Sequence, residues 1–149
     1  MPNESSNFAK IRLRKLDKDK VIKQITSEIE NLEGVICAIL FGSLAEDRYT
    51  GSSDADVLIV IDKKLPQDER YRRYNRISAN IDVQTFILTL DEATSRINNG
   101  DTFVINIVTT GIPLFGEKIF KHLKKLCEKA INQYGLEKTT IGWIRKKTI

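Results

Sequence analysis

The chain has 149 residues, of which 41% are hydrophobic and 30% are charged, and its net charge is +4. This composition supports one domain with a real core, and it excludes wholesale disorder. The longest apolar run is shorter than the roughly 18–20 residues that a membrane-spanning helix needs. Two distant cysteines and a single histidine exclude a disulfide framework and a Cys/His zinc cluster. Because no basic start precedes an apolar stretch, we expect a cytoplasmic protein without a secretory signal.

The charge is unevenly distributed along the chain. Residues 32–116 carry eight basic and twelve acidic side chains, whereas residues 117–149 carry nine basic and three acidic ones. The basic end is explained either by contact with RNA or an acidic partner, or by a solvated helix face. We expect a basic lead-in at 1–15, one domain at 16–134 and a basic C-terminal extension at 135–149.

Hydrophobic periodicity and turn residues predict the order of the elements. Asp17 or Asp19 is expected to cap the first helix, and Asp91 and Asp101 two later ones. The order indicates an α/β (α+β) domain with a small central sheet, and no element is predicted after Gly135. The expected elements are a helix to about 32, strands at 35–41 and 54–62, a helix at 68–77, a strand at 81–88, helices after 91 and after 101, an edge strand at 112–115 and a helix at 118–134.

Two pairs of residues at the ends of predicted strands suggest chemistry. Gly42 and Ser43 directly follow the first strand, and Asp54 and Asp56 open the second. Side chains two apart on a strand share a face, so the two carboxylates repel each other unless a cation is bound. Mg²⁺ suits one or two carboxylates together with substrate phosphates. Gly42 leaves room for a phosphate near the backbone, and Ser43 offers hydroxyl and amide groups to it, as a nucleoside triphosphate would need.

A third carboxylate is expected because two-metal phosphoryl transfer uses one near the attacking hydroxyl. The candidates are Asp62, Asp82 and Asp91. Asp62 lies about 20 Å along the strand from Asp56, and Asp91 follows a strand rather than starting one. Asp82 stands near the start of the third strand and would lie beside Asp54 and Asp56 if the two strands are neighbours. We therefore expect Asp82 to complete the site.

Each of these features has a structural explanation when taken alone. Gly-Ser is a common turn pair, and acids often begin strands at the surface. Their combination favours metal binding over coincidence. The stretch FGSLAEDRYTGSSDADVLIVID resembles the signature of the DNA-polymerase-beta-like nucleotidyltransferase superfamily. The short length and the segment INIVTTGIPLFGE resemble its minimal members in bacteria and archaea, and the resemblance covers about residues 20–131.

The resemblance implies a mixed sheet flanked by helices and a role for each candidate residue. Gly42 and Ser43 would hold the triphosphate, and Asp54 and Asp56 would ligate Mg²⁺. Asp82 would complete the metal site and help to activate the attacking hydroxyl. Members transfer a nucleoside monophosphate from a nucleoside triphosphate to a hydroxyl and release pyrophosphate. Many minimal members are antitoxins of a HEPN-type toxin, and some adenylylate a tyrosine of that toxin.

The sequence departs from the usual family pattern directly after Gly42 and Ser43. Many relatives carry a basic residue there, whereas residues 44–47 are Leu-Ala-Glu-Asp and the nearest base is Arg48. Arg48 is therefore the expected further contact for the triphosphate.

The segment 71–76 interleaves aromatic and basic residues, which is typical of some nucleic-acid interfaces. A helix with the ion pairs Asp68–Arg72 and Glu69–Arg73 explains the same pattern equally well. The sequence leaves both interpretations open.

Our first hypothesis is an Mg²⁺-dependent nucleotidyltransferase that transfers AMP from ATP to a hydroxyl of a protein or RNA, with a HEPN-type toxin as partner. The alternative is a non-catalytic module of the same fold that neutralises a partner protein by contact. The presence of all three acids favours the enzyme, since a module without catalysis has little use for carboxylates that repel each other. The acceptor, the base of the nucleotide and self-association as a homo-oligomer stay open.

Overall fold

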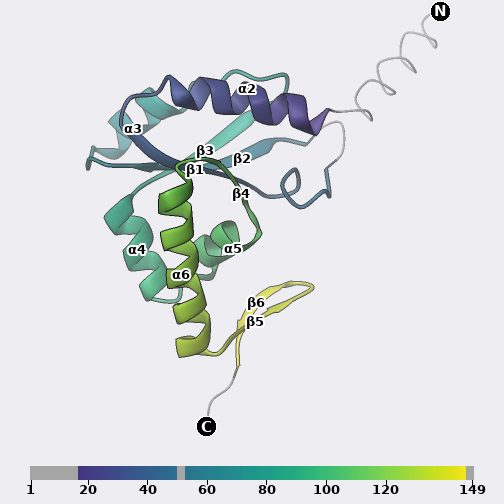
Figure 1. Ribbon diagram of the computed structural model, residues 1–149, viewed down its shortest axis with the longest axis vertical. Coiled ribbons are helices and arrows are strands. Elements are labelled where there is room, and N and C mark those ends of the chain that lie inside the picture. The colour runs from purple at the N-terminus through teal and green to yellow at the C-terminus, as the bar shows by residue number, and fades with distance from the viewer. Residues whose placement is uncertain (1–16, 50–52, 147–149) are drawn as a thin grey trace, which may run out of the picture.

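A four-stranded mixed sheet forms the centre of the computed structural model, which describes residues 17–49 and 53–146 (Figure 1). Its strands are β1 (Val35–Phe41), β2 (Ala55–Ile61), β3 (Val83–Thr89) and β4 (Ile112–Phe115). The helices are α2 (Lys18–Glu30), α3 (Gln67–Tyr74), α4 (Leu90–Asn98), α5 (Thr102–Thr110) and α6 (Glu117–Tyr134). A hairpin of β5 (Leu136–Thr139) and β6 (Gly142–Arg145) follows α6.

The strand order in the sheet is β3-β2-β1-β4. β1 pairs antiparallel with both β2 and β4, whereas β2 and β3 are parallel. This arrangement confirms the prediction of an α/β (α+β) domain with a small mixed sheet flanked by helices. It also makes the second and third strands neighbours, which the prediction for Asp82 required.

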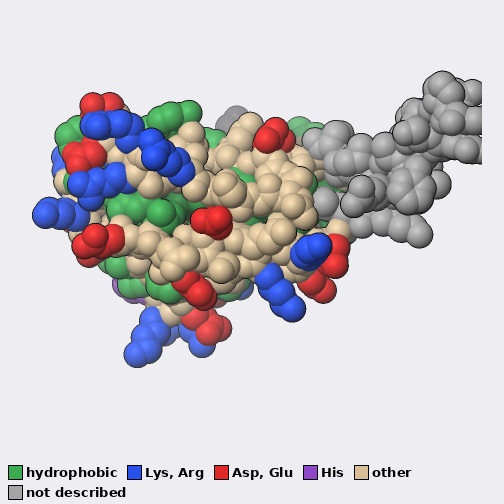
Figure 2. All heavy atoms as spheres, turned by 90° about the horizontal axis from the view of Figure 1, so that it is seen from above, with side chains coloured by type: hydrophobic (Ala, Val, Ile, Leu, Met, Phe, Trp, Pro, Cys, Tyr) green, Lys and Arg blue, Asp and Glu red, His purple; other side chains and the backbone are tan. Residues whose placement is uncertain are grey.

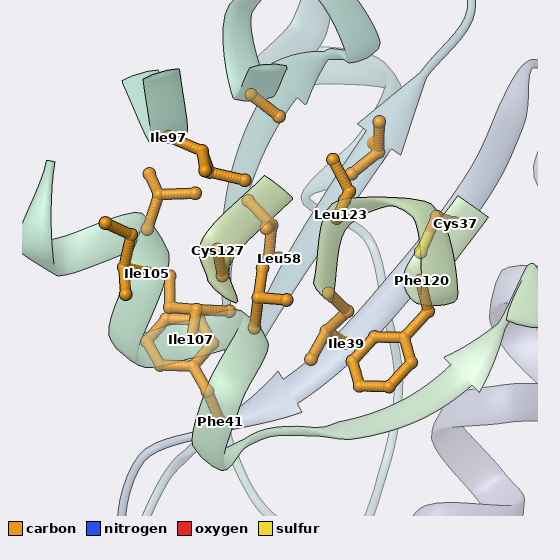
Figure 3. Close-up of a cluster of buried hydrophobic side chains, with 14 of the residues drawn as sticks. Cys37, Ile39, Phe41, Leu58, Ile97, Ile105, Ile107, Phe120, Leu123 and Cys127 are labelled. Carbon is orange, nitrogen blue, oxygen red and sulfur yellow. The ribbon is translucent and has the colours of Figure 1, made fainter. Parts of the chain in front are cut away.

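Two apolar clusters hold the layers together because β1 and β2 are buried on both faces. On one face α2 contributes Val21, Ile25 and Ile29, which lie at helical spacing and are buried. On the other face α4, α5 and α6 cover the sheet, and Figure 3 shows their side chains meeting those of β1 and β2. That second cluster includes Cys37, whose pKa is raised to about 12 by burial, as expected of a packing residue.

Side-chain caps begin α2, α4 and α5, whereas α3 and α6 begin without one, and the cap of α4 differs from the prediction. Asp17 caps α2 by accepting from the Lys20 N–H, and Asp101 caps α5, as predicted. The predicted cap at Asp91 is wrong. β3 extends to Thr89, whose hydroxyl accepts from the Glu92 N–H and caps α4 directly, so Asp91 falls in the first turn of that helix.

The α3 helix resolves the mixed pattern of segment 71–76 in favour of a helix with ion pairs. Arg72 and Arg73 pair with Asp68 and Glu69 at 3.8 and 2.6 Å. Tyr74 is buried, and its hydroxyl donates to a backbone carbonyl 2.7 Å away.

The C-terminal extension folds back onto the domain as the β5–β6 hairpin, at the lower end of α6 in Figure 1. Leu136 is buried, and Trp143 packs against the core cluster beneath α5 and α6. The Trp143 indole N–H donates to Asn106 Oδ1 at 3.0 Å. The expected lead-in at 1–15 lies outside the described residues. No helix among those described is long and apolar enough to cross a membrane.

Candidate active site

The backbone turns sharply where β1 ends, at Gly42. Its φ of +81° is a backbone conformation that residues other than glycine rarely adopt. A Cβ at this position would lie 2.5 Å from Asp56 Oδ2. The glycine is therefore required both by the turn and by the close approach of the Asp56 carboxylate.

Residues 42–48 form a turn rather than a helix. The Glu46 N–H donates to the Gly42 carbonyl at 3.1 Å, and the Arg48 N–H donates to the Ser43 carbonyl at 2.8 Å. Because the first of these bonds begins at Glu46, the N–H groups of residues 43–45 have no acceptor inside the turn. Ser43 thus stands at the open start of the turn, where amide groups can meet an anion.

Asp54 and Asp56 lie at the start of β2, beside the end of β1. The ladder pairs Asp56 with Phe41, the last residue of β1. Burial, and then the charge of Asp54, raise the pKa of Asp56. The two carboxylates therefore interact electrostatically, as their spacing predicts. Asp54 also accepts a hydrogen bond from the Gln84 side chain at 3.3 Å.

Asp82 lies on the segment that leads into β3, beside the start of β2, but among the described residues it is not part of a preformed metal-binding cluster. Its carbonyl accepts from the Ala55 N–H at 2.9 Å, and the register pairs Ala55 with Val83, so Asp82 is level with Asp54. Gln84 reaches Asp54, and residues 82 and 84 are two apart, which places Asp82 at the same face. Even so, the part of the chain described here contains no group of three or more His, Cys, Asp or Glu residues able to hold a metal. The role of Asp82 therefore stays a prediction.

The two other candidate acids lie elsewhere. Asp62 follows β2 at its opposite end, where its N–H donates to the Gly34 carbonyl. Asp91 belongs to the first turn of α4. Neither is near the start of β2.

Ion pairs neutralise the two acids that follow Gly42 and Ser43. Glu46 pairs with Arg48 at 3.0 Å, and Asp47 pairs with Lys18 at 2.6 Å. Glu46 also lies 3.9 Å from Lys138 Nζ. Three cations therefore offset these two acids, whereas Asp54 and Asp56 beside Gly42 have no basic partner among the described ion pairs.

Lys138 is the residue near the site that sequence reasoning missed. It stands on β5, and its ammonium donates to Asn106 Oδ1 at 3.0 Å while lying near Glu46. No spacing rule relates residues 46 and 138, because their proximity depends on how the C-terminal hairpin packs. The only sequence signal was the missing base after Gly42 and Ser43.

The donor set fits a hard divalent cation. Asp54 and Asp56 supply carboxylate oxygens, and the raised pKa of Asp56 reflects a repulsion that a cation would relieve. The absent Cβ of Gly42 leaves the Asp56 oxygen open toward the turn. Two carboxylates suffice for Mg²⁺ when phosphate oxygens complete its coordination.

Comparison with solved structures identifies several that are similar to this chain. A toxin–antitoxin complex with AMP-PNP contains a chain with 22% identity and a TM-score of 0.50, covering 80% of this chain and 88% of that one. The MntA–HepT toxin–antitoxin complex gives 21% identity, a TM-score of 0.44, and coverage of 79% and 84%. A tri-AMPylated Shewanella oneidensis HEPN toxin in complex with MNT antitoxin gives 20% identity and a TM-score of 0.45, and the match covers 82% of this chain and 87% of that one.

The family assignment comes from the sequence itself. No curated protein sequence matches the chain. Residues 23–120 match the family described as Polymerase beta, Nucleotidyltransferase. That match spans α3, the whole central sheet and the turn at Gly42, so it includes every residue that the sequence predicted for the site. The chain therefore belongs to the polymerase beta nucleotidyltransferase family and carries a nucleotidyltransferase domain.

Proposed function

We propose that this protein transfers AMP from ATP to a hydroxyl group of a macromolecular acceptor, with release of pyrophosphate. The observation that carries the proposal is the approach of the Asp56 carboxylate to Gly42, beside Asp54. A turn that can hold phosphates and a pair of acids that can hold a cation thus meet at the adjoining ends of β1 and β2.

The triphosphate is assigned to the turn after β1. The N–H groups at the start of the turn and the Ser43 hydroxyl would donate to its oxygens. Arg48 and Lys138 would supply positive charge from the two sides of Glu46, which both of them approach. Lys138 thus takes the place of the base that is missing directly after Ser43.

Asp54 and Asp56 are assigned to a bound Mg²⁺. When bound, the ion would neutralise charge on the phosphates and polarise the α-phosphoryl group. Asp82, at the same sheet face, is assigned to the acceptor side, where its carboxylate would take the proton of the attacking hydroxyl. That oxygen bonds to the α-phosphorus, the bond from this phosphorus to the bridging oxygen breaks, and pyrophosphate leaves with the electron pair.

The proposed partner is a HEPN-type toxin. The support is the resemblance of the sequence to minimal family members that are antitoxins of HEPN-type toxins, together with the fold shared with a chain of a toxin–antitoxin complex with AMP-PNP. The competing function is neutralisation of that partner by contact alone, without catalysis. The charged pair at Asp54 and Asp56 favours catalysis, because binding by contact gives no reason to bury repelling carboxylates.

Labelled nucleotides test the reaction directly. The protein is incubated with Mg²⁺, a purified HEPN-type protein, and ATP labelled at either the α- or the γ-phosphate. We expect label on protein only from α-labelled ATP, with stoichiometric pyrophosphate. Asp56→Asn should remove the label and keep the complex with the partner. A complex that forms without any label transfer would support the contact-only module instead.

A further inference from the structure

The outer edge of β3 presents backbone groups that are not paired. The Ala55 N–H donates to the Asp82 carbonyl, so the even-numbered residues of β3 direct their backbone groups toward β2. The odd-numbered residues then direct theirs outward. Two of these outward groups near the end of the strand are covered: the Ile87 carbonyl accepts from Arg70 at 3.4 Å, and the Thr89 N–H donates to Glu92 at 2.8 Å. Among the described residues, nothing pairs with the outward groups of Val83 and Thr85.

This edge lacks the features that normally prevent pairing with another chain. β3 has the sequence VQTFILT, with no charge and no proline, and its register with β2 is continuous. The other edge strand, β4, carries Pro113 and a register shift against β1. Natural sheets protect exposed edges with such prolines, bulges or charges. Their absence from β3 leaves the start of this edge open to pairing with a strand of another polypeptide.

A groove of about 510 Å³ lies along the same edge, between α3 on one side and α4 and α5 on the other. Its walls include Tyr71, Phe86 and Phe103, which are 63%, 40% and 47% exposed. The rings of Phe86 and Phe103 lie 5.6 Å apart, and both contact Phe41, the neighbour of Asp56 in the sheet. The apolar wall therefore extends toward the candidate active site.

The direction of the reaction places the acceptor on this side. In an in-line displacement the attacking oxygen and the leaving pyrophosphate lie on opposite sides of the α-phosphorus. The turn assigned to the triphosphate follows β1, the two acids stand on β2, and β3 is the next strand outward. An acceptor hydroxyl must then approach over the start of β3, where Asp82 stands.

The charges around the groove do not favour RNA. Arg70 is paired with Glu92 at 2.6 Å, and Arg96 lies 3.7 Å from Asp101. The other bases of α3 are paired with acids of the same helix. Figure 2 shows basic and acidic side chains interspersed on the face that it displays. Among the described residues, the bases that line the groove are thus all paired, so the groove offers no run of unpaired cations to a nucleic-acid backbone.

We propose that β3 is the docking site for an extended segment of the acceptor polypeptide, which adds to the sheet as a fifth strand and packs an apolar side chain against the exposed rings of Phe86 and Phe103. The proposal rests on the proposed function, since it names how that acceptor binds. Only an extended polypeptide offers both backbone donors and acceptors to Val83 and Thr85 and a side chain to the apolar wall. A second copy of this chain fits less well, because α3 on one side and α4 and α5 on the other flank the β3 edge of each copy.

The test uses a library of short random peptides as probe, with a random single-stranded RNA as the rival ligand. Peptides selected for binding are measured by calorimetry against the full chain, without nucleotide. We expect Phe103→Ala to weaken their binding about tenfold, as loss of a buried ring contact does. Phe115→Ala is the matched control, because it removes a 36%-exposed ring from the opposite edge strand and should change nothing.

Hydrogen exchange gives a readout that is independent of catalysis. Bound peptide should slow exchange at the N–H groups of Val83 and Thr85 and leave β4 unchanged. Equal effects of Phe103→Ala and Phe115→Ala, selection of RNA instead of peptide, or protection that appears with protein concentration alone would each overturn the proposal. If the edge is protected but no AMP is transferred, the docking site stands and the proposed reaction fails.

Discussion

At the scale of single residues, the site depends on a carboxylate held where its charge is unfavourable. Asp56 is partly buried beside Asp54, and its pKa is raised by that burial and by the neighbouring charge. Among the residues that the structure describes, no contact requires an acid at this position, since the ladder at Asp56 is formed by backbone groups. The ionised side chain therefore costs stability, which the proposed cation would relieve.

Asp56→Asn should abolish AMP transfer and leave the fold intact. Because one of two repelling charges is removed, we expect the free energy of unfolding to stay the same or to rise by about 0.5–1 kcal/mol. A thermal melt and the α-label assay measure the two effects. Asp62→Asn, at the opposite end of β2, is the control and should keep activity. Gross unfolding of the Asp56 variant would mean that the acid is structural.

Gly42→Ala should destabilise the protein for two separable reasons. The positive φ costs an alanine about 1–2 kcal/mol, and the new Cβ would lie 2.5 Å from Asp56 Oδ2. In an Asp56→Ala background the second cost disappears, because the carboxylate is gone. Urea unfolding of the two single variants and the double variant isolates the coupling. Purely additive effects would contradict the close approach of these two residues.

At the scale of elements, the sequence predicted those with a strong hydrophobic pattern. β1 was predicted to the residue, because a continuous apolar run between two glycines is typical of a strand that is covered on both faces. The β5–β6 hairpin was not, since its strands have four residues each and β5 is mostly polar. The cap of α4 was misplaced because Thr89 serves both β3 and the helix.

The candidate site likewise contains residues that the sequence predicted and residues that it did not. Local spacing predicted the acids of β2 and the turn at Gly42, and the structure places them together. Lys138 could not be predicted, since only the tertiary packing of the hairpin brings it near Glu46. The same is true of Arg70, a 2%-exposed side chain that joins α3 to α4 through Glu92.

The Arg70–Glu92 pair should make stability depend on pH. The hydrogen bond from Arg70 lowers the pKa of Glu92 from 4.5 to about 2. Its stabilisation is therefore complete above about pH 5 and is lost as the pH falls from 4.5 through 2. Glu92→Gln should lower the free energy of unfolding by about 3 kcal/mol at pH 7. This value is at the lower end of the range for breaking a buried ion pair, since Glu92 is partly exposed.

Urea unfolding at several pH values measures this contribution. The difference between wild type and Glu92→Gln should be constant from pH 7 to 5 and should shrink below pH 4.5. Glu69→Gln breaks the exposed pair with Arg73 and should cost only about 0.3–0.5 kcal/mol. If the difference in unfolding free energy between wild type and Glu92→Gln does not change with pH, then the variant loses packing or hydrogen-bond geometry rather than the charge of Glu92.

The hairpin should serve stability and nucleotide binding through different residues. Trp143→Ala should lower stability by about 2 kcal/mol, less than a fully buried tryptophan costs, because this ring is half-buried. Lys138→Gln should leave stability nearly unchanged and weaken ATP binding about fivefold. Lys129→Gln, an exposed lysine of α6, controls for net charge. Equal ATP affinity in the Lys138 and Lys129 variants would remove Lys138 from the phosphate site.

At the scale of the whole molecule, charge is segregated between the middle of the chain and its C-terminal end. The acids of the site belong to the acidic block 32–116, whereas the exposed lysines of α6 belong to the basic block 117–149. Lys138 is the exception, since it comes from the basic block and reaches the turn at Gly42 through Glu46. The proposed binding of a triphosphate would therefore use few cations of the central block and would need a metal ion to offset Asp54 and Asp56.

This dependence predicts how ligands change global stability. ATP without metal brings phosphates toward two carboxylates, so it should raise Tm little. Mg²⁺ with ATP at about a hundred times Kd should stabilise the fold by about 2.7 kcal/mol, which corresponds to roughly 5–10 °C for a domain of this size. Mg²⁺ alone should give a smaller rise, because two carboxylates without phosphates hold the ion weakly.

Thermal melts in EDTA, in Mg²⁺, in ATP with EDTA and in Mg²⁺ with ATP separate these contributions. The combined shift should exceed the sum of the two single shifts, since metal and nucleotide each complete the other's site. In the double variant Asp54→Asn/Asp56→Asn the combined Tm shift should no longer exceed this sum, whereas in Asp62→Asn it should still do so. If ATP in EDTA stabilises the wild type as much as ATP with Mg²⁺, then the phosphates are held by the turn, Arg48 and Lys138 alone, and the two acids have no part in nucleotide binding.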